Sequence, residues 1–215
     1  ATISINDVTA NEGNSGTTSF TFTVSMSNAS DDVVTVDYAT SNGTATSADP
    51  DYAAIAATTL TFAAGETSKT ITVSVNGDTK VEADETFTLT LSNLDNNGND
   101  VTLSDATGTG SITNDDAATM TISDVTALEG NSGTTNFVFT VTLSAASDDV
   151  VTVDYITGNG TATVADNDYS AIASTTLTFA AGETSKTITV VVNGDKKTES
   201  DETFTLTLSN LVDNG

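Results

Sequence analysis

The sequence predicts an all-β protein built from two tandem antiparallel β-sandwiches of about seven strands each. Three observations support this prediction. The chain repeats itself after 117 residues, its apolar residues recur at every second position, and 45 of its 215 residues are Thr. Thr is β-branched and favours strands over helices. Alternation of apolar and polar residues is typical of strands with one buried face.

The internal repeat predicts two domains. Residues 2–98 align with residues 119–215 without a gap, and 76 of the 97 aligned positions are identical. A period above 100 residues suits a whole domain and is too long for a solenoid unit. We therefore predict a first domain at 1–116 and a second at 117–215. The joining residues 115–118 contain neither Gly nor Pro, so we expect this short linker to restrict the angle between the domains.

The second copy ends before the first copy does. Nothing in the sequence after Gly215 corresponds to residues 99–116, which close the first copy. We therefore expect the second sandwich to lack its last strand. We interpret the early end as truncation of a longer array. Supply of the missing strand by a neighbouring molecule is the alternative, for which the sequence offers no support.

Seven runs with period-two apolar spacing predict the strands of the first copy. In chain order, these runs lie at 3–5, 20–26, 34–38, 60–62, 71–75, 87–91 and 110–112. Gly, Asn and Asp separate the runs and are typical turn residues. Seven short strands in about 115 residues indicate an immunoglobulin-like sandwich, with the apolar residues in its core.

Acidic residues gather where the predicted topology brings loops together. Successive connections of an antiparallel sandwich alternate between its two ends, so the loops after the first, third and fifth strands share one end with the residues after the seventh. Lys80 is the positive charge near that end. The same end collects nine carboxylates, at Glu12, Asp49, Asp51, Asp78, Glu82, Asp84, Glu85, Asp115 and Asp116.

This concentration of negative charge predicts a bound cation. Two like charges about 4 Å apart cost roughly 4 kcal/mol at an effective dielectric constant near 20, a large share of the roughly 5–15 kcal/mol that stabilises a domain. Calcium accepts 6–8 oxygen ligands in flexible geometry, whereas magnesium requires a tighter octahedron. A solvated acidic surface is the alternative interpretation. The second copy repeats most of these acids, which favours the calcium site.

The composition excludes several other functions. A formal net charge of −25 repels nucleic acids and anionic membrane surfaces. The chain contains no Cys, His or Arg, so it lacks thiolate nucleophiles, the usual acid–base catalyst and bidentate phosphate clamps. No apolar run approaches the roughly 20 residues that cross a bilayer. We therefore expect no enzyme, no nucleic-acid partner and no membrane insertion.

Several short motifs together resemble the Calx-β family. In the first copy they are Gly43-Thr44-Ala45, Asp51-Tyr52, Leu60-Thr61-Phe62, Gly65-Glu66-Thr67 and Glu82-Ala83-Asp84-Glu85-Thr86-Phe87. The second copy repeats them 117 residues later, so the resemblance covers essentially the whole chain. The family implies an immunoglobulin-like sandwich and occurs in sodium/calcium exchangers, an integrin tail and many bacterial surface proteins.

The resemblance also implies calcium ligands, and thus Ca²⁺ as the cofactor. In the first copy they are Glu12, Asp51, Asp78, the carbonyl of Lys80, Glu82, Glu85, Asp115 and Asp116. In the second copy they are Glu129, Asp168, Asp195, the carbonyl of Lys197, Glu199 and Glu202. The closing acids have no counterpart in the second copy, so its site is expected to be incomplete.

Near-identical repetition favours a structural function. We expect a calcium-binding repeat of a large secreted or cell-surface bacterial protein, an adhesin or matrix component. Its partners would be calcium ions and neighbouring repeats, and calcium would rigidify the domains and their junction. A calcium sensor is one alternative. A module that binds carbohydrate, ice or another cell directly through exposed Thr is the other. The sequence identifies no external ligand.

Overall fold

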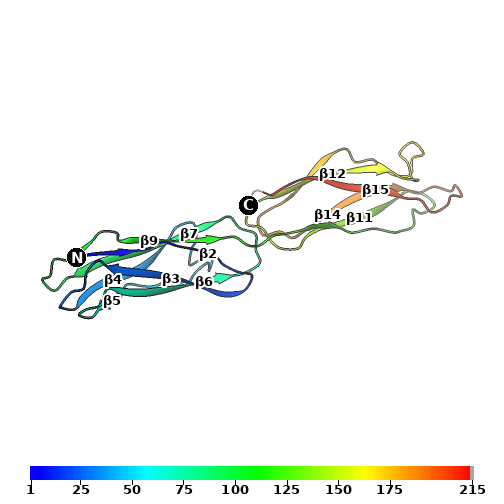
Figure 1. Cartoon of the computed structure of the whole chain (residues 1–215). Helices are drawn as coiled ribbons and strands as arrows, with labels where there is room; N and C mark the ends of the chain where they lie inside the picture. The colour runs from blue at the N-terminus through cyan, green and yellow to red at the C-terminus, as the bar shows by residue number, and fades with distance from the viewer. Residues whose placement is uncertain (214–215) are drawn as a thin grey trace. The chain divides into compact units, whose positions relative to one another are not determined.

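The computed structural model describes residues 1–213 and consists of β-strands joined by loops (Figure 1). The chain divides into two compact units, Ala1–Thr79 with Ala83–Asp116 and Lys80–Glu82 with Ala117–Gly215. These units follow the two sequence repeats, apart from the three residues Lys80–Glu82. Among the described residues, no helix has the length and apolar character needed to cross a membrane.

The first repeat contains nine strands, two more than the seven predicted runs. They are β1 (Thr2–Ile5), β2 (Val8–Asn11), β3 (Gly16–Met26), β4 (Val34–Asn42), β5 (Thr58–Phe62), β6 (Ser68–Gly77), β7 (Glu85–Asp95), β8 (Thr102–Leu103) and β9 (Thr107–Thr113). One sheet has the order β6-β3-β1-β8, and the other has the order β2-β9-β7-β4-β5. Together they form the predicted all-β, immunoglobulin-like sandwich, which confirms the fold class.

The additional strand β2 arises because the chain changes sheets at Asn6-Asp7. Strand β1 pairs antiparallel with β3, whereas β2 pairs parallel with β9 of the other sheet. Asn6 Oδ1 accepts a hydrogen bond of 2.5 Å from the amide of Thr23, and Asp7 Oδ1 accepts one of 2.7 Å from the amide of Thr109. The two side chains thus bind one strand of each sheet, and this holds the crossover in place.

The core of the first repeat is formed by the predicted alternating residues. Phe20, Phe22 and Phe87 are completely buried between the sheets. The rings of Tyr52 and Phe87 stack with their centroids 4.5 Å apart. The hydroxyl of Tyr52 donates a hydrogen bond of 2.6 Å to Asn42 Oδ1, so the polar end of this aromatic side chain is satisfied within the sandwich.

The second repeat contains six strands among the described residues. They are β10 (Met120–Ile122), β11 (Thr134–Leu143), β12 (Val151–Asn159), β13 (Thr175–Phe179), β14 (Ser185–Asn193) and β15 (Phe204–Val212). They form two three-stranded sheets, β10-β11-β14 and β13-β12-β15. The residues equivalent to β2 form no strand, and β15 pairs on one side with β12.

Candidate metal centres

Four groups of three carboxylates lie close enough together, among residues 1–213, for their oxygens to share a cation. Within each group, one oxygen from every member lies within 4.8 Å of the others. The first repeat contains Glu12 with Asp115 and Asp116, and Asp51 with Glu82 and Glu85. The second repeat contains Glu129 with Asp195 and Glu199, and Asp168 with Glu199 and Glu202.

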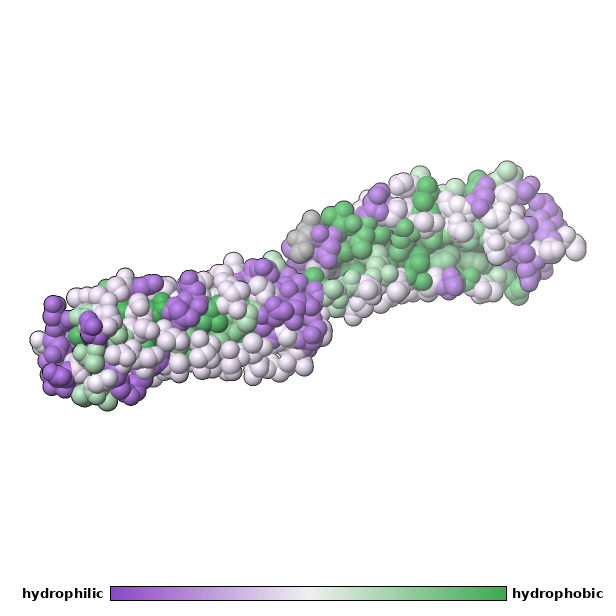
Figure 2. All heavy atoms as spheres, viewed as in Figure 1, coloured by the Kyte–Doolittle hydropathy of each residue, from purple (hydrophilic) through white to green (hydrophobic). Residues whose placement is uncertain are grey.

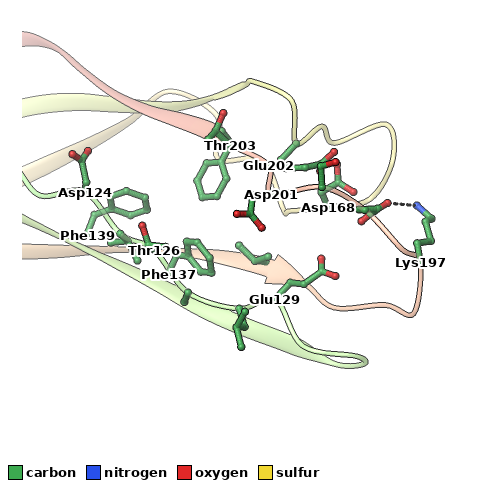
Figure 3. Close-up of a pocket in the computed structure, with 18 residues that line it drawn as sticks. Asp124, Thr126, Glu129, Phe137, Phe139, Asp168, Lys197, Asp201, Glu202 and Thr203 are labelled. Carbon is green, nitrogen blue, oxygen red and sulfur yellow. Dashed lines mark ion pairs between the residues drawn. The ribbon is translucent and has the colours of Figure 1, made fainter.

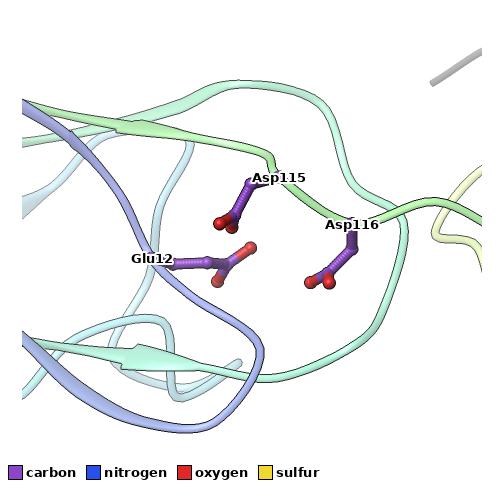
Figure 4. Close-up of side chains that lie close together, drawn as sticks. All are labelled: Glu12, Asp115 and Asp116. Carbon is purple, nitrogen blue, oxygen red and sulfur yellow. The ribbon is translucent and has the colours of Figure 1, made fainter.

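Parallel pairing of β2 with β9 assembles the first of these groups. Glu12 directly follows β2, and Asp115 and Asp116 follow β9. Because the two strands are parallel and end in register at Asn11 and Thr113, their carboxyl ends lie at the same edge of the sheet. Figure 4 shows the side chains of Glu12, Asp115 and Asp116 directed towards one another. We call this set the Glu12 group.

Loop hydrogen bonds position the acids of the Glu12 group. The amide of Gly13 donates to Asp115 Oδ1 at 3.1 Å, and Asn14 Nδ2 donates to Asp116 Oδ1. The amide of Asp116 itself donates to Asn114 Oδ1 at 3.0 Å. Gly13 has a φ of +84°, a left-handed conformation that glycine adopts without steric cost. The turn after Glu12 therefore depends on this glycine.

Burial within the Glu12 group leaves one carboxylate oxygen without a partner. The side chain of Glu12 is 5% exposed and Asp116 is 9% exposed. Asp116 Oδ2 is buried and has no hydrogen-bond partner in the described protein. Burial raises the pKa of Asp116, and the charges of Asp115 and Asp78 raise it further. Buried carboxylates are normally paired or bind a metal ion, so this oxygen fits a cation site.

The second group of the first repeat, which we call the Glu82 group, contains Asp51, Glu82 and Glu85. Asp51 Oδ2 accepts a hydrogen bond of 2.6 Å from the amide of Thr46, which holds the carboxylate in its loop. Burial raises the pKa of Glu82 to about 7, although the ammonium of Lys80, 3.0 Å from Glu82 Oε1, opposes this shift. Lys80 thus neutralises part of the charge of this group.

The groups of the second repeat are more exposed and share Glu199. Asp168 Oδ2 accepts a hydrogen bond of 2.6 Å from the amide of Thr163, as Asp51 does from Thr46. Lys197 Nζ lies 3.5 Å from Asp195 Oδ2 and 3.5 Å from Glu199 Oε1. No residue here corresponds to Asp115 or Asp116. The two groups of the second repeat therefore consist of acids equivalent to those of the first repeat, except that equivalents of Asp115 and Asp116 are missing from them.

The structure brings most of the predicted site residues into these four groups. Asp78 belongs to none of them, although its charge raises the pKa of Asp116. The prediction for Lys80 and Lys197 concerned only their backbone carbonyls. In the structure, their ammonium groups form ion pairs with carboxylates, as Figure 3 shows for Lys197. Of the nine acids of the first repeat that were predicted as one cluster, six form two groups of three, and Asp49, Asp78 and Asp84 belong to neither group. Their role as calcium ligands stays a prediction.

Sequence reasoning missed two asparagines that organise the Glu12 group. Asn14 and Asn114 hold Asp116, and Asp84 Oδ1 accepts a hydrogen bond of 3.0 Å from the amide of Asn114. Asp84 was counted in the acidic cluster but was assigned no such role. Asn often bonds to backbone groups a few residues away, and such bonds are common in turns, so the residue type alone did not distinguish the two asparagines from ordinary loop residues.

The donor chemistry of all four groups suits a hard cation. Every member offers carboxylate oxygens, and most lie on loops between strands. Calcium prefers several oxygen ligands and tolerates irregular geometry, whereas zinc is usually bound by nitrogen or sulfur. Calcium is therefore the cation that fits these groups best.

Comparison with known proteins identifies a domain family. The sequence model of the Calx-beta domain matches residues 2–126 and again residues 113–215. Among solved structures, CBD12 from CALX1.2 is 24% identical, with 98% of this chain and 81% of that chain covered and a TM-score of 0.48. The calcium binding domain CBD12 of CALX1.1 is 23% identical, with coverages of 97% and 79% and a TM-score of 0.47. No curated protein matches the chain.

Proposed function

The chain belongs to the Calx-beta family, and from this premise we propose that it is a calcium-binding structural module. In this proposal, calcium joins the carboxylate groups of each repeat and rigidifies the domains and their junction. The observation that carries the proposal is the buried oxygen of Asp116, which has no hydrogen-bond partner and lies among the carboxylates of the Glu12 group.

A bound cation would relieve an electrostatic cost of the fold. The oxygens of Glu12, Asp115 and Asp116 lie within 4.8 Å of one another, a distance at which like charges repel by several kcal/mol at an effective dielectric constant near 20. The Glu12 group and the Glu82 group would hold calcium in the first repeat. The ion supplies positive charge and coordination there, and loops from distant parts of the sequence become linked through it.

A structural role in a secreted or cell-surface protein is the setting that we propose. Two copies with 76 identical residues in 97 are suited to building length, and calcium affinities of about 10⁻⁴–10⁻³ M are typical of extracellular modules. We propose a bacterial adhesin or matrix protein as the parent. The carboxylates lie in groups of three whose oxygens are close together, and the sequence contains no His or Cys, which supports a module without catalytic activity.

Calorimetric titration of the chelator-treated chain with calcium tests this function. We expect saturable binding, weaker binding in Glu12→Gln and unchanged binding in Asp31→Asn, whose carboxylate belongs to none of the groups. Magnesium should bind much more weakly, because it retains its water shell. Absence of saturable heat up to about 10 mM calcium, above the range of extracellular modules, would contradict the proposal. Equal weakening in both variants would indicate a response to bulk charge alone.

A further inference from the structure

Asn-Gly pairs recur in both repeats, and the structure gives one of them an environment that differs from the others. The sequence contains six such pairs, of which five lie among residues 1–213 and Asn214-Gly215 lies outside the described residues. Asn is a thermolabile residue, and a following Gly has no side chain to shield its amide nitrogen from the asparagine side chain. The reactivity of each pair therefore depends on how the fold holds these two groups.

Four of the five pairs begin in paired strands. In two of them, the asparagine Oδ1 accepts a hydrogen bond from a tyrosine hydroxyl, at 2.6 Å and 2.7 Å. In the other two, the asparagine Nδ2 donates to a backbone carbonyl. Strand pairing and these bonds together hold both the backbone and the side chain in place. The four asparagines are Asn42, Asn76, Asn159 and Asn193.

The glycines of these four pairs also pack closely against neighbouring backbone. A Cβ atom placed on any of them would overlap a carbonyl oxygen of another segment, which belongs to Thr86 for Gly43 and to Thr203 for Gly160. This close approach explains why glycine is required at these positions. It also hinders the backbone rotation that would bring the glycine nitrogen to the asparagine side chain.

The fifth pair, Asn97-Gly98, lies in an exposed turn between β7 and β8. Asn97 has a φ of +50° and Gly98 a φ of +84°, as in the two-residue turns that Asn-Gly favours. The side-chain amide of Asn97 makes no hydrogen bond within residues 1–213. A Cβ atom placed on Gly98 would have no other segment of the described chain within 4 Å. Neither group is therefore held as in the other four pairs.

Two hydrogen bonds inside the turn are all that must break for Gly98 to become free to react. The amide of Gly98 donates to Asn96 Oδ1 at 3.2 Å, and the amide of Asn99 donates to the carbonyl of Asn96 at 2.9 Å. The turn lies beside the N-terminus, whose ammonium donates to the carbonyl of Asp100 at 2.6 Å, and Figure 2 shows hydrophilic surface at that end of the first repeat. Exposed loops open far more readily than core strands.

We propose that Asn97-Gly98 is a site of spontaneous deamidation in the folded protein. The amide nitrogen of Gly98 attacks the side-chain carbonyl carbon of Asn97, and the new N–C bond closes a succinimide ring. The side-chain nitrogen leaves as ammonia and takes with it the proton of the Gly98 amide. Water then adds to either carbonyl carbon of the ring, whose bond to the Gly98 nitrogen breaks. The products are aspartate, or isoaspartate when the chain continues through the side-chain carboxyl carbon.

Either product changes the turn. The new carboxylate arises on the residue whose amide already donates to Asp95 Oδ1 at 3.0 Å, and like charges repel. Isoaspartate also lengthens the main chain by one carbon. Asn96 Nδ2 donates to the carbonyl of Val101 at 3.2 Å, and Val101 is 3% exposed, so the turn is connected to the core just before β8. Deamidation therefore loosens this end of the first repeat as the protein ages.

Mass-spectrometric peptide mapping of the full chain tests the proposal. The protein is aged in chelator at mildly alkaline pH, and the mass gain of deamidation is followed at each asparagine. In the folded protein, we expect Asn97 to react at least about ten-fold faster than the four strand asparagines, because their reaction requires strands to open. In urea, where the strands are lost, the five rates should become similar.

Hydrogen exchange of the aged protein tests the effect on the turn. Amides of residues 96–103 should exchange faster after ageing, and those of β3 should not change. Asn97→Gly is the matched control, because Gly-Gly suits the same turn and carries no side-chain amide. Its exchange should be unaffected by ageing.

Three results would overturn the proposal. One is a rate at Asn97 no higher than at the strand asparagines of the folded protein. Another is a ratio of rates that is the same in urea, which would show that the sequence alone sets reactivity. The third is an Asn97 that stays intact in the folded protein while the chain in urea reacts completely.

Discussion

At the scale of single residues, Asp116 has an electrostatically unfavourable environment in the first repeat. Its Oδ1 receives a hydrogen bond from Asn14, whereas its buried Oδ2 receives none from the described protein. Burial and the charges of Asp115 and Asp78 raise the pKa of this carboxyl group. The ionised form is therefore less stable in the calcium-free fold than in water.

Replacement of this carboxylate should have opposite effects with and without calcium. We expect Asp116→Asn to stabilise the calcium-free protein by up to about 1 kcal/mol, because it removes an uncompensated charge. The same variant should lose most of the stabilisation that calcium gives the wild type, which is about 2.7 kcal/mol at 100 times the dissociation constant. Urea denaturation in chelator and in calcium measures both effects. Destabilisation of the calcium-free variant would show that Asp116 contributes favourably without an ion.

Asp37 and its equivalent in the second repeat, Asp154, lie outside the four carboxylate groups and should make the stability of the protein depend on pH. Thr59 Oγ1 donates to Asp37 Oδ1 at 2.6 Å, and Thr176 Oγ1 donates to Asp154 Oδ1 at 2.6 Å. These bonds, with further bonds from Asn93 and Asn210, hold the pKa of both carboxyl groups below the ordinary value of 3.8. A carboxylate with a lowered pKa in the fold contributes stability above its ordinary pKa.

We therefore expect both carboxylates to stabilise the protein at neutral pH. This contribution should disappear as the pH falls below 3.8 and through the pKa of the folded protein. The double variant Asp37→Asn/Asp154→Asn should be less stable than the wild type at pH 7, and the difference should shrink towards pH 2–3. Chemical denaturation of both proteins in chelator at several pH values measures this difference in stability. A difference that is constant with pH would contradict the linkage.

At the scale of the elements, the crossover from β1 to β2 depends on Asp7. Its Oδ1 accepts the hydrogen bond from the amide of Thr109 in β9. The equivalent residue of the second repeat is Asp124, which has no equivalent of β9 to bind among the described residues. The two repeats therefore offer the same side chain with and without its partner strand.

This pair of residues permits a matched comparison. We expect Asp7→Ala to destabilise the first repeat by about 1 kcal/mol, because the amide of Thr109 loses its acceptor. Asp124→Ala should leave the stability of the second repeat nearly unchanged. Native-state hydrogen exchange distinguishes the repeats and measures both changes. Similar effects of the two substitutions would show that Asp7 acts locally and not through β9.

At the scale of the whole molecule, two of the predicted calcium ligands are directly followed by the linker between the repeats. Asp115 and Asp116 belong to the Glu12 group and are followed directly by Ala117. We expect calcium to hold this segment and to narrow the distribution of distances between the two repeats. Small-angle X-ray scattering in chelator and in calcium tests this expectation, with Asp116→Asn as the insensitive control. Identical distributions in the two conditions would contradict rigidification of the junction by calcium.

The sequence alone determined those features that depend on local pattern and internal repetition. Alternation of Phe20 and Phe22 with polar residues marks a strand wherever that strand pairs, because side chains of a strand point to alternate faces. The match of residues 2–98 with 119–215 indicated two similar domains. The order of strands and loops also placed Glu12, Asp51, Glu82 and Asp116 at one end, since antiparallel connections alternate between ends.

Only the tertiary structure decided which of these residues meet and how deeply each is buried. The pairing of β2 with β9 joins residues about 100 positions apart, for example Val8 and Gly110, and no local pattern encodes such a register. That pairing brings Glu12 close to Asp115 and Asp116. It also explains why residues 125–128, although similar to β2, form no strand. A strand and a buried charge are both defined by their non-local neighbours, which the linear sequence does not specify.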